Sequence, residues 1–271
     1  MDLPPDDFVE VKATVRGVTF PMLVKRRADA KVMLVFGQSA LSTRTDISLP
    51  VFHRWSWMAD FPEATCVALS DPTLALDPGL LGGWFQGEPD HFYAETAAAL
   101  LRGLAARLGI PPGCIVFYGS SAGGFTSIVM AGEIGASAVV EIPQIVMSDY
   151  HVASALRGLL RHCYGGLDLQ EAKRRFGARM DITTRLRETK RLPDILYLQN
   201  LADKVHVERH MQPFLATIAQ LWEEEPELRA KRLAVEFYSA RAANGDGHAV
   251  APKAFTVRAL RRAMRDALAQ G

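Results

Sequence analysis

The chain has 271 residues, of which 49% are hydrophobic, and its formal net charge is +1. This length suits one α/β domain, so we expect a single domain over residues 1–271. The near-neutral balance excludes a global attraction to nucleic acid or to an acidic membrane, and we expect neither as a partner.

The N-terminus and the cysteines favour a cytoplasmic protein. Residues 1–7 have neither the basic start nor the apolar core of a signal peptide, and no run approaches 18 apolar residues. Cys66, Cys114 and Cys163 are odd in number and widely spaced, and two of them lie in apolar runs that suit buried free thiols. We therefore expect a soluble protein in a reducing compartment, and leave its oligomeric state open.

The first half of the chain predicts a hairpin followed by buried strands. Apolar runs within residues 8–24 flank the turn-like pair Arg16-Gly17, which predicts an antiparallel hairpin at one edge of a sheet. Residues 32–36 and 66–69 are short apolar runs, typical of strands buried on both faces. Leucines at helical spacing within residues 100–108 predict a helix before the strand that starts at Cys114.

The same alternation continues to the end of the chain. Residues 137–142, 195–199 and 233–238 are predicted strands, and residues 252–268 are a predicted helix. Strands and helices that alternate in this way predict an α/β fold, with a mainly parallel sheet covered by helices on both faces.

One segment interrupts this alternation. About fifty largely helical residues separate the strands ending near 142 and starting near 195, which predicts a helical cap insertion at about 147–192. Residues 157–191 carry ten basic against four acidic side chains. A basic cap could attract an anionic substrate, although such charges more commonly form a solvated helical face.

Residues 114–125 contain the motif Gly-x-Ser-x-Gly, centred on Ser121 and placed between a predicted strand and a predicted helix. This is the pattern of a nucleophile elbow, in which Gly119 and Gly123 leave room for a sharp turn that lifts the serine above the sheet edge. We therefore predict Ser121 as a nucleophile, while its neighbour Ser120 should point elsewhere.

A serine hydroxyl needs a base, and the base needs an acid that fixes its tautomer. Asp203 follows the strand at 195–199, where active-site groups of parallel sheets collect, and His248 lies in the loop after the last strand. We predict Asp203 as the acid and His248 as the base. Two alternatives compete: Asp203 could only cap a helix, and Asp246 is a rival acid that lies too close to His248 in a tight loop.

His206 and His210 are spaced i, i+4 on a predicted helix, which could suggest a metal pair. Because no third ligand is evident, we expect these two histidines to make surface or cap contacts. We predict no metal and no cofactor.

With its elbow, the order Ser-Asp-His and an alternating sheet, the chain resembles the α/β-hydrolase superfamily over nearly its whole length. The resemblance implies Ser121 as nucleophile, His248 as general base and then acid, and Asp203 as the orienting carboxylate.

The resemblance also implies an oxyanion hole made of two main-chain amides. One belongs to Ala122, directly after the nucleophile. The other lies in the loop at Gly37-Gln38-Ser39, which departs from the His-Gly-Gly pattern of many esterases, and we favour Gln38.

Three residues near the same sheet edge are candidate substrate contacts: Asp71, Trp84 and Gly37. Asp71 could contact a substrate hydroxyl or stabilise a turn. Trp84, like the nearby Trp55, Trp57 and Phe85, could stack on a sugar or accept an acyl chain, although aromatic residues more commonly cover a core.

Three short segments, at residues 54–57, 70–74 and 83–87, are weakly similar to hydrolase-like proteins of bacterial glycan-assembly systems. This similarity implies an acylated carbohydrate, or a related anionic glycan, as substrate.

The leading hypothesis is a serine hydrolase that cleaves a carboxylic ester, of a small molecule or a glycan, through an acyl-enzyme on Ser121. One alternative is an acyltransferase that uses the same three residues. The other is a non-catalytic, hydrolase-like binding or assembly protein.

Overall fold

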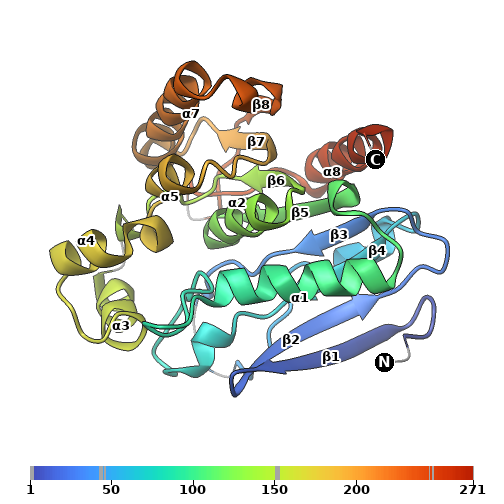
Figure 1. Ribbon diagram of the computed structural model, residues 1–271, viewed down its shortest axis with the longest axis horizontal. Helices are drawn as coiled ribbons and strands as arrows, with labels where there is room; N and C mark the ends of the chain where they lie inside the picture. The colour runs from blue at the N-terminus through green and yellow to red at the C-terminus, as the bar shows by residue number, and fades with distance from the viewer. Residues whose placement is uncertain are drawn as a thin grey trace.

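The computed structural model describes residues 3–42, 45, 47–149, 153–243, 245 and 247–270. Among these residues, eight strands form one sheet in the order β1-β2-β4-β3-β5-β6-β7-β8 (Figure 1). The strands are β1 Phe8–Val15, β2 Val18–Lys25, β3 Met33–Phe36, β4 Thr65–Leu69, β5 Ile115–Ser120, β6 Ser137–Glu141, β7 Asp194–Asn200 and β8 Leu233–Tyr238. β2 pairs antiparallel with β1 and with β4, and the other neighbours pair in parallel. The predicted mainly parallel sheet is confirmed.

The N-terminal hairpin has the geometry that its sequence predicts. Val15 pairs with Val18, so the loop is the two residues Arg16 and Gly17. Both have positive φ, 50° and 78°, as the tight hairpin turns that match the twist of a sheet require. This hairpin forms the antiparallel edge of the sheet.

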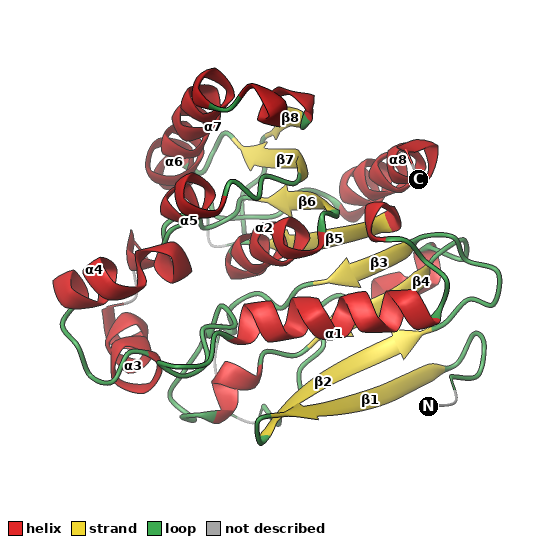
Figure 2. Ribbon diagram, in the orientation of Figure 1, coloured by secondary structure: helices red, strands yellow, loops and turns green. Residues whose placement is uncertain are grey.

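Helices cover both faces of the sheet (Figure 2). Their bounds are α1 Tyr93–Arg107, α2 Ala122–Ile134, α3 Ala153–Cys163, α4 Leu169–Met180, α5 Ile182–Thr189, α6 Lys204–His206, α7 Gln212–Glu224 and α8 Lys253–Gln270. On one face Leu101 of α1, Phe125 of α2 and Phe214 of α7 belong to one apolar core. On the other face Leu260 and Met264 of α8 belong to a second core. The sheet is therefore the middle of three layers.

The segment between β6 and β7 is helical, as its sequence predicts, and contains α3, α4 and α5. In Figure 1 the arrowheads of the parallel strands point toward the side on which α3 and α4 lie. Asp168 and Asp181 cap α4 and α5, since their carboxylates accept the N–H groups of Glu171 and Thr183 at 2.9 and 2.8 Å. That residues 147–192 act as a cap over a functional site stays a prediction.

The three cysteines are free thiols and all are buried, which agrees with the sequence analysis. Within the described ranges, the structure contains no helix of the length and apolar character needed to span a bilayer.

Candidate active site

Ser121 lies at a sharp turn between β5 and α2 and has a backbone conformation that side chains rarely adopt, with φ 51° and ψ −118°. Its N–H donates to the carbonyl of Glu141 at 3.0 Å, and its carbonyl accepts the N–H of Gln144 at 3.1 Å. Such strain persists only where the surroundings hold it, and it is typical of a nucleophile elbow.

Glycines let the elbow and the loop after β3 approach one another. A Cβ on Gly119 would overlap the carbonyl of Gly123, so the turn requires glycine at this position. A Cβ on Gly123 would lie 3.1 Å from the carbonyl oxygens of both Gly37 and Gln38. The Gly37–Gln38 loop is thereby brought against the first turn of α2.

Ser121, His248 and Asp203, which are far apart in the sequence, form one chain of hydrogen-bonding contacts. The Nε2 atom of His248 lies 3.1 Å from Oγ of Ser121, and its Nδ1 atom lies 2.7 Å from Oδ2 of Asp203. Ser120 points elsewhere, since its Oγ lies 2.9 Å from Oγ of Ser39. The rival acid Asp246 is outside the described residues.

Asp203 both caps a helix and contacts His248. Its Oδ1 accepts the N–H of His206 at 3.1 Å, which caps α6, while its Oδ2 faces His248. Burial opposes ionisation, but hydrogen bonds from His206 and His248 outweigh it and hold the pKa of Asp203 well below its usual range. The two roles that the sequence left as alternatives are compatible.

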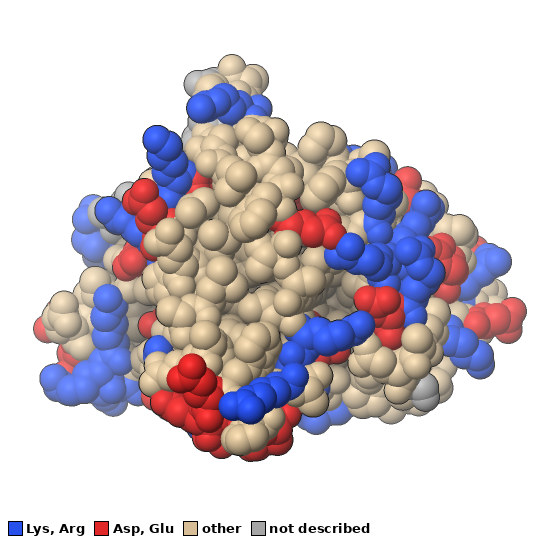
Figure 3. Space-filling model, turned by 90° about the horizontal axis from the view of Figure 1, so that it is seen from above, with Lys and Arg blue, Asp and Glu red and all other residues tan. Residues whose placement is uncertain are grey.

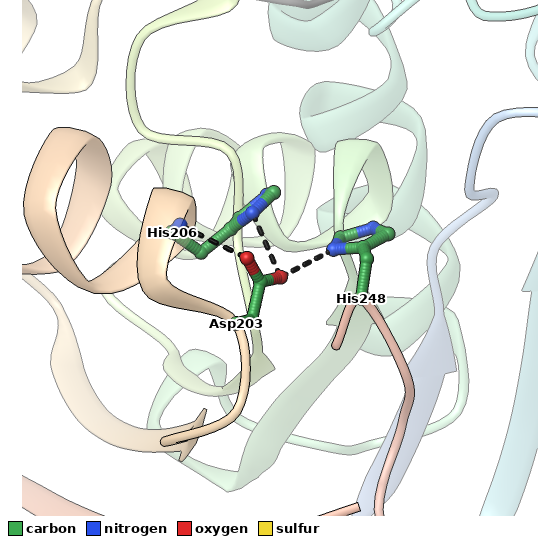
Figure 4. A group of neighbouring side chains, drawn as sticks. All are labelled: Asp203, His206 and His248. Carbon is green, nitrogen blue, oxygen red and sulfur yellow. Dashed lines mark hydrogen bonds and ion pairs between the residues drawn. The ribbon is translucent and has the colours of Figure 1, made fainter. Parts of the chain in front are cut away.

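The structure places His206 and His210 in the interior, so of the expected surface or cap contacts the surface contacts are wrong, while contacts with the cap stay a prediction. Both residues are buried, since they are only 5% and 1% exposed. Nδ1 of His206 lies 2.9 Å from Oδ2 of Asp203, and its ring stacks on that of His248 with centroids 4.3 Å apart (Figure 4). Nδ1 of His210 accepts the N–H of Val146.

Asp203, His206 and His248 are also the residues that could reach one metal ion, since their donor atoms lie within 4.8 Å of one another. A hydrogen bond of 2.7 Å joins the carboxylate to Nδ1 of His248, and an ion-pair contact of 2.9 Å joins it to Nδ1 of His206. A cation would have to displace a proton from each ring. We therefore do not assign the group as a metal site.

Asn200, which sequence analysis did not single out, holds the loop that carries His248. Its Nδ2 lies 2.8 Å from the carbonyl of Gly247 and 3.0 Å from that of Ala249, the residues on either side of His248. Its Oδ1 accepts the N–H of Ala202 at 3.0 Å. One side chain therefore ties the acid loop to the base loop.

Glu141, at the end of β6, is a second residue that sequence analysis missed. It is fully buried, and its carboxylate accepts the N–H of Ala251 at 2.5 Å and the hydroxyl of Tyr118 at 2.7 Å. Its carbonyl also accepts the N–H of Ser121. A charged residue closing an apolar strand was the available signal, because buried carboxylates need partners.

Two main-chain amides are available for an oxyanion. Ala122 opens α2, and within the described part of the chain its N–H has no acceptor; the same holds for the N–H of Gln38. The N–H of Ser39 donates to Nδ1 of His53 at 2.9 Å, so it is occupied. This difference favours Gln38 over Ser39, and the dipole of α2 adds positive potential at the same point.

A cavity of about 580 Å³ opens beside Ser121 and His248. Its lining combines hydroxyl groups, one arginine and apolar side chains: Ser39, Ala40, Leu41, Ser42, Ser120, Ile142, Arg241, Ala242, Ala249 and Val250. This volume lies within the range of small-molecule sites.

The three candidate substrate contacts lie outside this lining. Asp71 is buried, and its oxygens accept the N–H groups of Thr73 at 2.9 Å and Phe85 at 2.8 Å. Burial raises its pKa to about 6. Trp84 is buried and donates to Gln144 at 2.9 Å, and Gly37 packs against α2. Their contact with substrate stays a prediction, and these placements favour structural roles.

Two of the ten basic side chains of residues 157–191 make contacts inside the fold. Arg179 donates to the carbonyls of Gln86, Glu88 and Pro89, and the buried Arg185 pairs with Glu95 and Glu133. Among the described residues, none from 157–191 lines the Ser121 cavity. On the face shown in Figure 3, basic and acidic side chains mix around the rim and the centre carries few charges.

No family model matches the sequence, and no curated protein matches it. Solved structures do match. A capsule O-acetyltransferase of Neisseria meningitidis serogroup A is 13% identical over 92% of this chain and 95% of its own, with a TM-score of 0.61. An esterase of Rhizomucor miehei is 14% identical over 99% and 86%, with a TM-score of 0.61.

A chain of the Glycosylation Associate Protein (Gap123) complex of Streptococcus agalactiae is also similar, at 12% identity and a TM-score of 0.63. The match covers 93% of this chain and 46% of that one. At such identities the likeness concerns the fold alone, and the fold of this chain is that of the α/β hydrolases.

Proposed function

We propose that this protein is a serine esterase that forms an acyl-enzyme on Ser121. One observation carries the proposal: at a strained strand-to-helix turn, Oγ of Ser121 lies 3.1 Å from Nε2 of His248, whose Nδ1 lies 2.7 Å from Asp203. A hydroxyl, an imidazole and a carboxylate in this order are the parts that nucleophilic acyl transfer needs.

In the proposed reaction, Oγ of Ser121 bonds to the carbonyl carbon of the ester while Nε2 of His248 takes the hydroxyl proton. Asp203 keeps the other proton on Nδ1 and stabilises the imidazolium. The amides of Ala122 and Gln38 hold the negative oxygen. The bond to the leaving alcohol then breaks, and His248 returns the proton to that oxygen.

Water completes the cycle by the same route. His248 removes a proton from water, the hydroxide attacks the acyl carbon, and the bond to Oγ breaks as Ser121 recovers its proton. The reaction releases an acid and an alcohol, and the enzyme returns to its starting state.

An acylated carbohydrate is the substrate that we propose. The hydroxyl groups of Ser39 and Ser42 and the guanidinium of Arg241 in the cavity lining support a polar alcohol as leaving group. Leu41, Ile142 and Val250 offer apolar surface for a short acyl chain. Hydrolysis rates on acetylated sugars, compared with simple alkyl esters of the same acyl group, test this choice.

Acyl transfer is the second candidate, and the likeness of the fold to a capsule O-acetyltransferase over nearly all of both chains favours it. The same acyl-enzyme would pass its acyl group to an alcohol in place of water. Product analysis with added sugar acceptors separates the two, because hydrolysis that no acceptor diverts counts against transfer.

Labelling with a fluorophosphonate followed by peptide mapping tests the common step. We expect an adduct on Ser121 that is absent in Ser121→Ala and strongly reduced in His248→Ala. A folded wild-type protein that takes no label would favour the non-catalytic binding or assembly alternative.

A further inference from the structure

Two imidazoles meet at one oxygen of Asp203 (Figure 4). Its Oδ2 lies 2.7 Å from Nδ1 of His248 and 2.9 Å from Nδ1 of His206. Its Oδ1 accepts the main-chain N–H of His206 at 3.1 Å. An ionised carboxylate only accepts hydrogen bonds, so Nδ1 of His248 carries a hydrogen. A bare ring nitrogen 2.9 Å from the same oxygen would repel it, which favours a hydrogen on Nδ1 of His206 as well.

We propose that His206 is a positioning residue for Asp203 and His248. Its Nδ1–H makes a second polar contact with Oδ2, at 2.9 Å, which fixes the carboxylate opposite His248 and moderates the attraction of that carboxylate for the His248 proton. The inference rests on the proposed function, because it concerns the base of that reaction. His206 acts through Asp203, since the cavity beside Ser121 is not lined by it.

The surroundings hold the His206 ring in one place. The ring stacks on His248 with an interplanar angle of 28° and lies 4.6 Å, between centroids, from the ring of His210. His210 is fixed in turn, because its Nδ1 accepts the N–H of Val146. A donor held between two neighbours can keep a hydrogen bond at constant geometry while His248 gains and loses its proton.

Two buried groups near this cluster are neutral at neutral pH. Burial, together with the neighbouring His206, lowers the pKa of His210 to about 3, so it is neutral at neutral pH. Burial raises the pKa of Tyr197, which packs near Asp203, and it too is neutral. Arg241 lines the cavity, and Arg209 lies in the helical segment Val207–Met211 that follows α6. The side chains in direct contact with one another at the carboxylate are Asp203, His206 and His248.

Two substitutions of His206 distinguish the contribution of its N–H donor from that of its stacked ring. His206→Asn places an amide N–H near the position of Nδ1 and removes the stacked ring. His206→Phe keeps a ring and removes the donor. Without the donor, the negative charge on Asp203 favours the imidazolium of His248 more strongly, so a higher pH is needed to free the base.

The rate of fluorophosphonate inactivation, measured as a function of pH, shows at which pH His248 becomes free to act as a base. This measurement needs no known substrate. We expect His206→Phe to move the midpoint of the acid limb up by about half to one pH unit and to lower the plateau by up to about tenfold. His206→Asn should leave the midpoint near that of wild type. A midpoint that is the same in all three proteins, or that moves equally in both variants, would overturn the inference.

If a variant fails to fold, the wild-type protein still allows an independent test, which is the position of the hydrogen on the His206 ring. In ¹⁵N spectra of histidine-labelled protein at neutral pH, His206 should carry its hydrogen on Nδ1; a hydrogen on Nε2 alone contradicts the inference. Failure of the proposed function looks different, because wild type would then take no label on Ser121 whatever the state of His206.

Discussion

The two halves of the proposed catalytic site are built in different ways. Around Ser121 the main chain does the positioning, through a strained turn and the close contact between Gly123 and the loop at Gly37. Around His248 side chains do it, because Asn200 and Asp203 hold the loop and the ring by hydrogen bonds. We therefore expect the first half to be sensitive to added atoms and the second to be sensitive to the loss of hydrogen-bond donors.

The largest effect should come from the reacting atom of the first half. We expect Ser121→Ala to lower kcat by about 10⁴-fold to 10⁶-fold, since it removes the nucleophile. Ser120→Ala is the matched control, because its Oγ contacts Ser39 instead of His248, and it should cost less than about tenfold. Equal losses in steady-state ester hydrolysis would argue against Ser121 as nucleophile.

An added methyl group tests the main-chain half directly. Gly119→Ala would drive a Cβ into the carbonyl of Gly123, so we expect a loss of about 3 kcal/mol or more in the free energy of unfolding, measured with urea. Gly103→Ala, in α1, meets nothing within 4 Å and should add up to about 1 kcal/mol. A stable, active Gly119→Ala protein would refute the packing argument.

A lost donor tests the side-chain half. Asn200→Ala removes the donor to the carbonyl of Gly247 and one of the two donors to that of Ala249, which keeps the hydroxyl of Tyr238, so His248 should lose its fixed position. We expect kcat/KM to fall by about 10-fold to 100-fold and the free energy of unfolding by about 1–3 kcal/mol. Gln220→Ala removes an exposed amide that bonds only Glu224 among the described residues, and should change neither.

Acidification should lower the free energy of unfolding, because His210 is buried beside the side-chain half of the site. Its pKa is lowered from 6.5 to about 3 in the fold, so its stabilising contribution is complete above about pH 6.5 and is lost as the pH falls toward 3. Between about pH 7 and pH 5.5 the loss from this residue should be about 1 kcal/mol.

His210→Asn checks this pH dependence, because an amide oxygen can accept the N–H of Val146 without titrating. Its urea-unfolding free energy should fall less than that of wild type over the same pH interval. Parallel curves for the two proteins would show that His210 is not the titrating group.

The difference between main-chain positioning of Ser121 and side-chain positioning of His248 also explains which features the sequence can predict. The hairpin, the parallel strands and the final helix follow from short-range patterns, and the structure confirms them. The surroundings of Ser121 were visible for the same reason, since glycines at fixed spacing mark a turn of the main chain. Predicted roles for Ser121, Asp203 and His248 are matched by their proximity, and those roles stay proposals.

The supports of His248 could not be predicted in this way. Asn200 and Glu141 are single polar residues at strand ends, and their partners, at 247–251, lie far along the chain. His206 was visible only as half of an i, i+4 pair, and its contact with Asp203 depends on how α6 begins. Hydrogen bonds between distant segments leave no local period in a sequence.

The most direct test of the account is a rapid-quench experiment with p-nitrophenyl acetate, analysed by mass spectrometry of the Ser121 peptide. The account predicts a burst of p-nitrophenol close to one per protein, an acetyl group on Ser121 that forms with the burst and decays as water resolves it, and neither signal in Ser121→Ala. Release of p-nitrophenol at the same rate in wild type and Ser121→Ala, with no acetyl group on Ser121, would contradict it.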